Sequence, residues 1–315
     1  MFCDRADAML RHDLLSTIGD TPLVELTHLS PKPGVRLFAK LEGQNPSGSV
    51  KDRIALAMVE ALESERGLRR GDTLIEASTG NTAIALAMVA RQRGYKLKVV
   101  IPEGVVPSIA DILALYGVDI VWCKPRSGML GPIQETLRLA ERYGWHAVGQ
   151  FSNPVNVATH YLGTGAEIAR DLPEVDIFVA GLGTGGTLMG VGRRLRELNG
   201  AVKLIGVEPR LGERLQGLRS LDEGFPPPLI DLGLLDGRFL VPSDRAIAAA
   251  YRIIRTEGIM AGVSCGACLY AALRVAERID KGNIVIMFSD GGWKYLPARP
   301  WESACLLYTS PSPRD

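Results

Sequence analysis

The sequence has few of the features that mark secreted, membrane or nucleic-acid-binding proteins. Its five cysteines are odd in number and scattered, so free thiols in a reducing, cytoplasmic setting are expected. No apolar run approaches the ~20 residues that span a bilayer. The N-terminal MFCDRADAML lacks the apolar core of a signal peptide. A net charge of +1 gives no reason to expect nucleic acid or an acidic membrane surface as a partner.

The length and composition fit a soluble globular protein of two domains. The chain has 315 residues, of which 46% are hydrophobic and 23% charged, and a domain typically takes ~100–200 residues. From about Pro297 the apolar pattern is lost, and LLYTSPSPRD resembles translated sequencing-adapter read-through. Residues 301–315 are therefore predicted to be a non-native tail, the alternative being an ordinary disordered end.

Short runs rich in Val and Ile alternate with longer helical patterns. The runs are predicted to be buried strands, at residues 96–102, 118–123, 175–181, 202–209 and 283–289. Helices are predicted at residues 50–66, 81–93, 129–143, 186–198 and 243–256. Glycines at their ends are typical of helix C-termini, at Gly67, Gly94, Gly144, Gly200 and Gly258. The alternation predicts an α/β fold with mostly parallel sheets and a domain seam near residues 150–154. Ligands are expected in the strand-to-helix loops.

The first such loop is NPSGSVKDR, residues 45–53, which leads into a helix. Lys51 falls in the first turns, where the helix dipole disfavours its charged form. A lower pKa would make this amine a better nucleophile toward an aldehyde. The alternative is a solvated helix start capped by a serine.

The second loop is EASTGNT, residues 76–82, between a strand and a helix. Its hydroxyls and the free N–H groups of a helix N-terminus suit a carboxylate. The alternative is a capping cluster, since Ser, Thr and Asn are common N-caps.

The third loop is GLGTGGT, residues 181–187, and it has the composition of a phosphate cradle. Its glycines permit close backbone approach, and the helix that follows favours an anion. The loop also matches G-x-G-x-x-G, with Glu208 as the ribose-binding acid of a dinucleotide enzyme. Taken alone, it supports both kinds of ligand, and a purely structural turn is a third interpretation.

The fourth loop is GVSCGAC, residues 262–268, which opens another helix. Ser264 could cap that helix or present its hydroxyl to a ring nitrogen. Cys265 and Cys268 form a C-x-x-C that suggests redox chemistry or zinc, but zinc takes four ligands and no second pair is present. Packing of small residues is the favoured interpretation of the two thiols.

Together, the four loops resemble the cysteine synthase family of fold-type II pyridoxal-phosphate enzymes. The resemblance runs from GDTPLVEL at Gly19 to GGWKYL at Leu296, with the motifs in the family's order. It implies two three-layer α/β domains, like the tryptophan synthase β chain. Residues 1–44 with 153–300 would form the larger, phosphate-binding domain, and residues 45–152 a smaller mobile domain that closes over the substrate and carries the Schiff-base lysine. The dinucleotide interpretation explains only the third loop.

The resemblance also implies roles for individual residues. Lys51 would hold pyridoxal 5'-phosphate as a Schiff base and later remove the substrate α-proton. Asn81 would bond the phenolic oxygen of the cofactor, and Ser264 would face its ring nitrogen. The phosphate would lie on Gly183, Thr184, Gly185, Gly186 and Thr187. The substrate carboxylate would be bound by Ser78, Thr79, Gly80, Thr82 and Gln150. No metal is expected.

LRSLDEGF, residues 218–225, resembles the subgroup of cysteine synthases that use O-phosphoserine, that of cysteine synthase B. By this resemblance Arg219 would pair with the substrate phosphate, whereas a surface ion pair with Asp222 is the alternative. The sulfur donor in that subgroup is a small carrier protein with a C-terminal thiocarboxylate, instead of free sulfide. O-acetylserine stays open as the substrate, and a homodimer is expected from the family.

Several positions depart from the family pattern. Ser78-Thr79 stands where Thr-Ser is usual, Ala83 replaces a glycine, and Cys265 replaces a Ser or Thr. Residues 102–113 lack the usual Ser followed by Glu-Arg-Arg, which leaves partner choice and substrate entry open. Three alternatives remain: a sister β-replacement that makes cystathionine or a diaminopropionate precursor, a dinucleotide-dependent oxidoreductase, and a non-catalytic binding protein.

Overall fold

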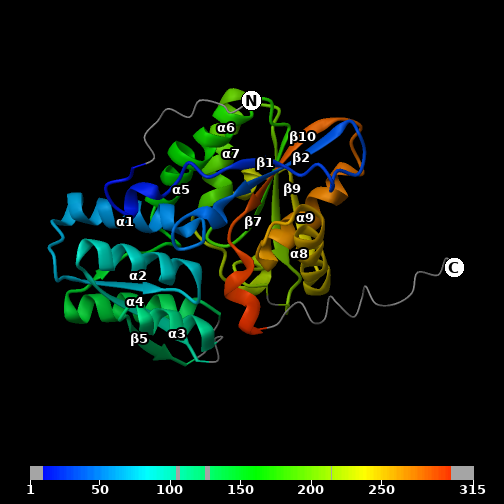
Figure 1. Ribbon diagram of the computed structural model, residues 1–315. Coiled ribbons are helices and arrows are strands. Elements are labelled where there is room, and N and C mark those ends of the chain that lie inside the picture. The colour runs from blue at the N-terminus through cyan, green and yellow to red at the C-terminus, as the bar shows by residue number, and fades with distance from the viewer. Residues whose placement is uncertain (1–9, 104–106, 125–127, 214, 299–315) are drawn as a thin grey trace.

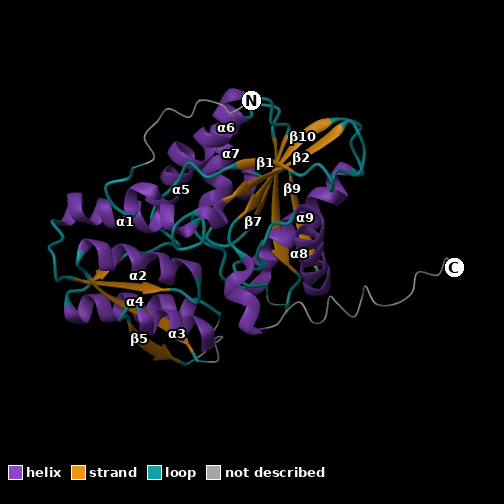
Figure 2. Ribbon diagram, viewed as in Figure 1, coloured by secondary structure: helices purple, strands orange, loops and turns teal. Residues whose placement is uncertain are grey.

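The protein is built around two β-sheets with helices on both faces of each (Figures 1 and 2). The computed structural model describes residues 10–103, 107–124, 128–213 and 215–298. The predicted tail at 301–315 lies outside these residues. Among the described residues, no helix is both long and apolar enough to cross a membrane.

The larger sheet has six strands in the order β1-β2-β10-β7-β8-β9. They are β1 (Leu23–Glu25), β2 (Val35–Leu41), β10 (Gly282–Phe288), β7 (Ile177–Gly181), β8 (Lys203–Pro209) and β9 (Gly237–Val241). All neighbours are parallel except β1 and β2. The carboxyl ends of the parallel strands therefore meet at one edge, where ligands bind in such sheets.

The smaller sheet has four parallel strands in the order β5-β4-β3-β6. They are β5 (Asp119–Cys123), β4 (Lys96–Pro102), β3 (Thr73–Ala77) and β6 (His146–Ala147). Residues 150–154, the predicted seam, form the turn between β6 and the next helix, α5 (Val155–Thr159).

Helices cover both faces of each sheet, so each sheet is the middle of three layers. On the smaller sheet, α1 (Lys51–Arg66), α2 (Asn81–Arg93) and α3 (Pro107–Leu115) pack on one face and α4 (Leu130–Tyr143) on the other. On the larger sheet, α8 (Ser243–Glu257) and α9 (Val263–Ala276) cover one face. The other face packs against α6 (Gly165–Asp171) and α7 (Gly186–Leu198). Short helical turns are η1 (Leu15–Thr17), η2 (Glu42–Gln44), η4 (Leu221–Glu223), η5 (Leu232–Leu234) and η6 (Gly292–Ala298).

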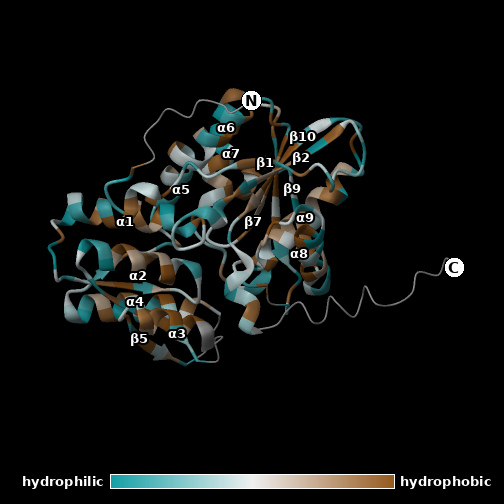
Figure 3. Ribbon diagram, viewed as in Figure 1, coloured by the Kyte–Doolittle hydropathy of each residue, from teal (hydrophilic) through white to brown (hydrophobic). Residues whose placement is uncertain are grey.

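The predicted α/β fold is confirmed, and all five predicted strands and all five predicted helices form. The strands are apolar because both faces of each sheet are covered (Figure 3). Four of the five predicted C-terminal glycines adopt the left-handed conformation, but Gly200 does not. There α7 ends at Leu198 with Asn199 as its cap in an extended conformation. The helix therefore ends at the predicted residue, Leu198, but without a left-handed glycine.

Candidate active site

Three of the four loops singled out in the sequence meet around Asp290, at the carboxyl edge of the larger sheet. This residue follows β10 and is buried. A β-bridge joins it to Ser49, just before Lys51, and its backbone oxygen accepts from Gly262 N at 3.1 Å. Its carboxylate accepts from Asn81 Nδ2 at 2.8 Å. Asp290 therefore joins three loops from distant parts of the chain.

Lys51 is the first residue of α1 and is partly buried. Burial lowers the pKa of Lys51 to about 8, although the charge of Asp290 raises it. The direction is the one expected from the sequence, but desolvation is the main cause. Val50, the cap of α1, has no side-chain cap bond, and its N–H donates to Ser289 O at 2.8 Å. The start of α1 is thus fastened to the end of β10, in the larger sheet.

The predicted carboxylate loop lies between β3 and α2. Ser78 Oγ accepts from Gly80 N at 3.4 Å and from Ala83 N at 3.2 Å, so it caps α2. Thr82 Oγ1 donates to Gln150 Oε1 at 2.6 Å, and Gln150 Nε2 donates to Ala77 O at 3.0 Å. The structure thus brings Gln150, 68 residues away from Thr82, to this loop. Thr79, by contrast, is exposed at the loop's tip.

Glu76, near the end of β3, forms hydrogen bonds with the turn that carries Gln150. Its Oε2 accepts from Gly149 N at 2.6 Å and from Gln150 N at 3.4 Å. Burial raises the pKa of Glu76 to about 7 in spite of these hydrogen bonds. The carboxyl therefore holds the turn that presents Gln150.

Residues 183–187 join β7 to α7 and have the geometry of an anion site. The first helical hydrogen bond of α7 runs from Met189 N to Gly185 O, so the amides before it have no partner within the helix. Gly186 N donates to Thr184 Oγ1 at 3.4 Å. A Cβ on Gly183 would lie 3.0 Å from Gly217 O, and one on Gly186 would lie 1.8 Å from Asn156 Oδ1. The loop is thus confined to glycine at these positions, and its backbone suits the phosphate of pyridoxal phosphate.

The buried amide of Asn156, which the sequence reasoning missed, supports this loop. Its Nδ2 donates to Gln150 O at 2.8 Å and to Thr184 Oγ1 at 3.1 Å. A path of hydrogen bonds therefore runs from Thr82 through Gln150 and Asn156 to the predicted phosphate loop, residues 183–187. Only the tertiary fold reveals this path, because Asn156 stands in a sequence without a recognisable motif.

His160, also missed, is fully buried beside the phosphate loop. It lies in a π-helical segment, η3 (His160–Thr164), of a kind often found at functional sites. Its Nε2 is 3.1 Å from Thr187 Oγ1 and its Nδ1 is 3.0 Å from Thr164 Oγ1. Burial, with the charges of Lys51 and Arg53, lowers the pKa of His160 well below its usual range. The imidazole is therefore neutral and holds the Thr187 hydroxyl in place.

Ser264 is buried in the first turn of α9, close to Gly217. The neighbouring Cys265 and Cys268 are free and buried, and burial raises the pKa of Cys265 to about 12 and that of Cys268 well above its usual range. Both thiols stay protonated and unreactive. The described residues contain no group of ligands that could hold a metal.

Glu208, the candidate ribose-binding acid, is occupied elsewhere. It is fully buried at the end of β8, with Oε2 accepting from Leu221 N at 2.7 Å and Oε1 lying 2.6 Å from Arg238 Nη2. A carboxylate committed in this way has no oxygen directed at a ribose, so the geometry argues against a dinucleotide site.

Arg219 lies beside the site instead of pairing with Asp222. Its guanidinium is 5.0 Å from the centre of the ring of Phe151, the neighbour of Gln150 in the chain. The backbone N–H of Arg219 donates to Leu182 O at 2.8 Å. Burial lowers the pKa of Arg219. Asp222 lies 3.7 Å from Arg238. Among the described residues, no carboxylate is within ion-pair distance of Arg219.

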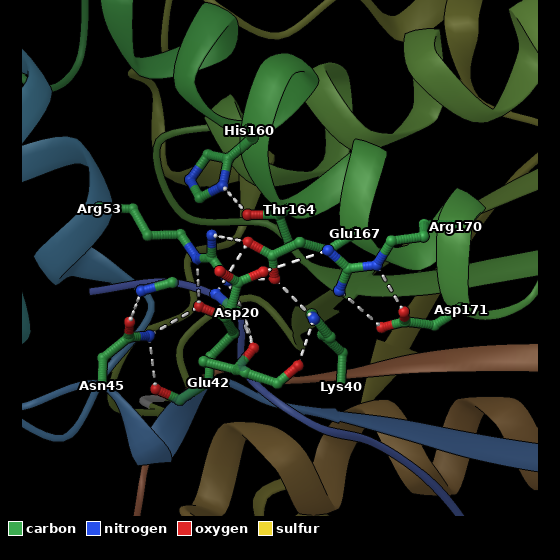
Figure 4. A network of polar contacts seen from close by, with 12 residues as sticks. Asp20, Lys40, Glu42, Asn45, Arg53, His160, Thr164, Glu167, Arg170 and Asp171 are labelled. Atoms are coloured by element: carbon green, nitrogen blue, oxygen red, sulfur yellow. Dashed lines mark hydrogen bonds and ion pairs between the residues drawn. The ribbon is translucent and has the colours of Figure 1, made fainter. Parts of the chain in front are cut away.

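A buried network of charges fixes the start of α1 (Figure 4). Arg53 Nη1 is 2.6 Å from Glu167 Oε1, and its Nε is 2.7 Å from Glu42 Oε2. Lys40 Nζ is 2.7 Å from Glu167 Oε2. Burial raises the pKa of Glu167, but Arg53 and Lys40 outweigh it and hold that pKa at about 2. The network joins α1 to β2, η2 and α6, two residues away from Lys51.

Residues 14–290 match the family described as pyridoxal-phosphate dependent enzyme. The chain belongs to this family, and its cofactor is pyridoxal phosphate. A cysteine synthase of Staphylococcus aureus is 37% identical over 294 residues, covering 90% of this chain and 95% of the relative. The cysteine synthase B of Salmonella typhimurium is 37% identical over 284 residues, covering 90% and 94%.

Solved structures of two kinds of enzyme share the fold. O-ureido-L-serine synthase is 35% identical, with a TM-score of 0.88 over 93% of this chain and 96% of that one. Cysteine synthase of Entamoeba histolytica is 31% identical, with a TM-score of 0.86 over 98% and 96%. The two-sheet architecture is thus the one shared by these enzymes.

Proposed function

We propose that this enzyme is a cysteine synthase, which replaces the β-substituent of an activated serine with sulfur. The observation that carries the proposal is the meeting of Lys51, Asn81 and the phosphate loop around one edge of the larger sheet, in a chain similar to cysteine synthases. Bound pyridoxal phosphate supplies an electron-withdrawing ring that makes the substrate α-proton acidic.

Residues of the chain would bind the substrate and transfer the proton. The Lys51 amine holds the cofactor and, once displaced by substrate, accepts the α-proton on Nζ, for which a pKa of about 8 is well suited. The start of α2 and Gln150 hold the substrate carboxylate. The β-carbon–oxygen bond breaks and the leaving group departs with its electron pair. Sulfur then bonds to the β-carbon, and the Lys51 ammonium returns its proton to the α-carbon. Residues 45–152 would move as the smaller domain.

Arg219 supports O-phosphoserine as the preferred substrate. The guanidinium is partly buried over Phe151, beside Gln150, and among the described residues it has no carboxylate within ion-pair distance, although the charge of Glu223 raises its pKa. Such a group suits a dianionic phosphate. We further propose that a thiocarboxylated carrier protein delivers the sulfur, as in the subgroup this sequence resembles.

The test compares O-phosphoserine with O-acetylserine as substrates of the holoenzyme, with sulfide as the nucleophile. We expect Arg219→Met to lower kcat/KM for O-phosphoserine about ten- to a hundredfold, the value of a hydrogen bond to a charged group. The rate with O-acetylserine should hardly change. Arg210→Met, at an exposed arginine, is the matched control. Equal losses with both substrates would contradict the role of Arg219, and no cysteine from either would contradict the proposed activity.

A second candidate is an O-ureidoserine-type replacement, favoured by the similarity to O-ureido-L-serine synthase. The two candidates differ only in the nucleophile. Competition between sulfide and hydroxyurea in the same assay separates them, because the first gives cysteine and the second gives O-ureidoserine.

A further inference from the structure

Lys294 is a partly buried cation next to the site, and the activity described above does not use it. It lies in η6, after β10. Its Nζ donates to Asn81 Oδ1 and, at 3.2 Å, to Gly48 O. Burial lowers the pKa of Lys294, against the charges of Asp290 and Asp52, which raise it. The side chain thus reaches from the larger sheet to the start of α2.

Both polar atoms of the Asn81 side-chain amide have a hydrogen-bond partner. Its Oδ1 accepts from Lys294, and its Nδ2 donates to Asp290 Oδ2 at 2.8 Å. An ammonium can only donate and a carboxylate can only accept, so these two neighbours admit one orientation of the amide. The opposite orientation would direct N–H groups at the ammonium and the carbonyl oxygen at the carboxylate.

Asp290, the acceptor for Asn81 Nδ2, has further contacts of its own. The Tyr295 hydroxyl donates to the oxygen that accepts from Asn81. The backbone oxygen of Asp290 accepts from Gly262 N at 3.1 Å. The carboxylate is therefore held by Tyr295 as well as by Asn81, and the backbone of Asp290 is fastened to the start of α9.

We propose that Lys294 is a positioning residue that, with Asp290, orients the Asn81 amide so that it offers an N–H donor to the phenolic oxygen of the cofactor. The inference rests on the proposed role of Asn81 in the site. An amide nitrogen carries two protons, so Asn81 can bond Asp290 with one and donate the other. The Tyr295 hydroxyl also forms a hydrogen bond with the Asn81 side chain, so the phenolic oxygen of the cofactor would take this second proton in competition with it. With its Oδ1 held by Lys294, the amide cannot present its carbonyl oxygen, which would repel a phenolate.

The experiment measures the affinity of the apoprotein for pyridoxal phosphate, and the visible absorption of the bound cofactor, in Lys294→Met. We expect the affinity to fall about tenfold and the band to shift, because a hydrogen bond to a charged oxygen is lost. Lys294→Arg should restore both, since arginine keeps the charge and the donors. Lys281→Met, at an exposed lysine, should match the wild type. If Lys294→Met does not fold, Lys294→Leu is measured against Lys294→Arg in its place.

Two further measurements distinguish a positioning effect of Lys294 on Asn81 from a general effect of Lys294 on protein stability. In an Asn81→Ala background, Lys294→Met should have no added effect, because the amide through which it acts is gone. A cofactor analogue that lacks the phenolic oxygen should bind the wild type and Lys294→Met equally. An equal loss of affinity for the analogue, or an added loss in the Asn81→Ala background, would overturn the proposal. The proposal would also be overturned if Lys294→Met bound pyridoxal phosphate with the affinity and the absorption of the wild type.

The outcomes also distinguish this inference from the proposed function. A wild-type protein that does not bind pyridoxal phosphate contradicts the function itself. If Asn81→Ala binds and absorbs like the wild type, Asn81 has no role at the phenolic oxygen and the inference fails, while the activity stands. If Asn81→Ala is impaired and Lys294→Met is not, only the positioning role fails.

Discussion

The guanidinium of Arg53 forms a two-pronged ion pair with the carboxylate of Glu167, 114 residues away. Nη1 is 2.6 Å from Oε1 and Nη2 is 2.7 Å from Oε2. Both side chains are largely buried, and Glu42 lies on the other edge of the same guanidinium. Because Arg53 lies two residues after Lys51, this pair fastens the start of α1 to the helix that carries Glu167.

Arg53→Met should destabilise the protein by about 3–5 kcal/mol, since it leaves two buried carboxylates with less compensating charge. Chemical unfolding of the apoprotein measures the change. Arg138→Met removes an exposed pair with Glu135 and should cost less than about 1 kcal/mol. Equal effects of the two substitutions would mean that the buried network contributes no more than a surface pair.

Gly186→Ala should disturb the phosphate loop through Asn156. The new Cβ would lie 1.8 Å from Asn156 Oδ1, so Asn156 must move away from Thr184 and Gln150. We expect a loss of about 1–3 kcal/mol in stability, as for an overpacked core, and weaker binding of the cofactor. Unfolding and titration with pyridoxal phosphate measure the two effects.

Gly200→Ala is the control for that prediction. Gly200 is exposed and does not adopt the left-handed conformation, and no atom lies within 4 Å of the position that a new Cβ would take. This substitution should be neutral or stabilising by up to about 1 kcal/mol. Similar losses at both glycines would show that the contact with Asn156 is not what restricts Gly186.

The reaction of Lys51 with pyridoxal phosphate should depend on pH with a midpoint near its pKa of about 8. Only the unprotonated amine attacks an aldehyde, so labelling of the apoprotein, trapped with borohydride, should rise as pH increases through that value. An ordinary lysine would respond near ~10.4. Asp290→Asn should move the midpoint lower, because the charge of Asp290 raises the pKa of Lys51.

Peptide mapping assigns the label in that experiment, and Lys51→Met supplies the background from other lysines. A midpoint that stays near ~10.4 in the wild type would mean that Lys51 is solvated like a surface lysine. A midpoint that rises in Asp290→Asn would contradict the assigned effect of Asp290.

Strands and helices with strong apolar periodicity were predictable from the sequence, and β2 was not. Its sequence, VRLFAKL, contains Arg36 and Lys40, and a lysine within a strand suggests contact with solvent. Lys40 is in fact fully buried, because Glu167 lies 2.7 Å from its ammonium. The partner that makes this burial possible is 127 residues away. No local pattern could have revealed it.

The sequence by itself determined the alternation of strands and helices and the order of the glycine- and hydroxyl-rich loops, because periodicity and turn chemistry act over a few residues. Only the tertiary structure decided which side chains share the site. Asn156, His160 and Asp290 follow no motif, and Lys294 lies in GGWKYL, a segment to which the sequence assigns no role. These four residues become recognisable when the sheets bring them to the loops. Burial, which sets the pKa of Lys51, is likewise a property of the packed chain, because desolvation depends on every element that excludes water from the amine.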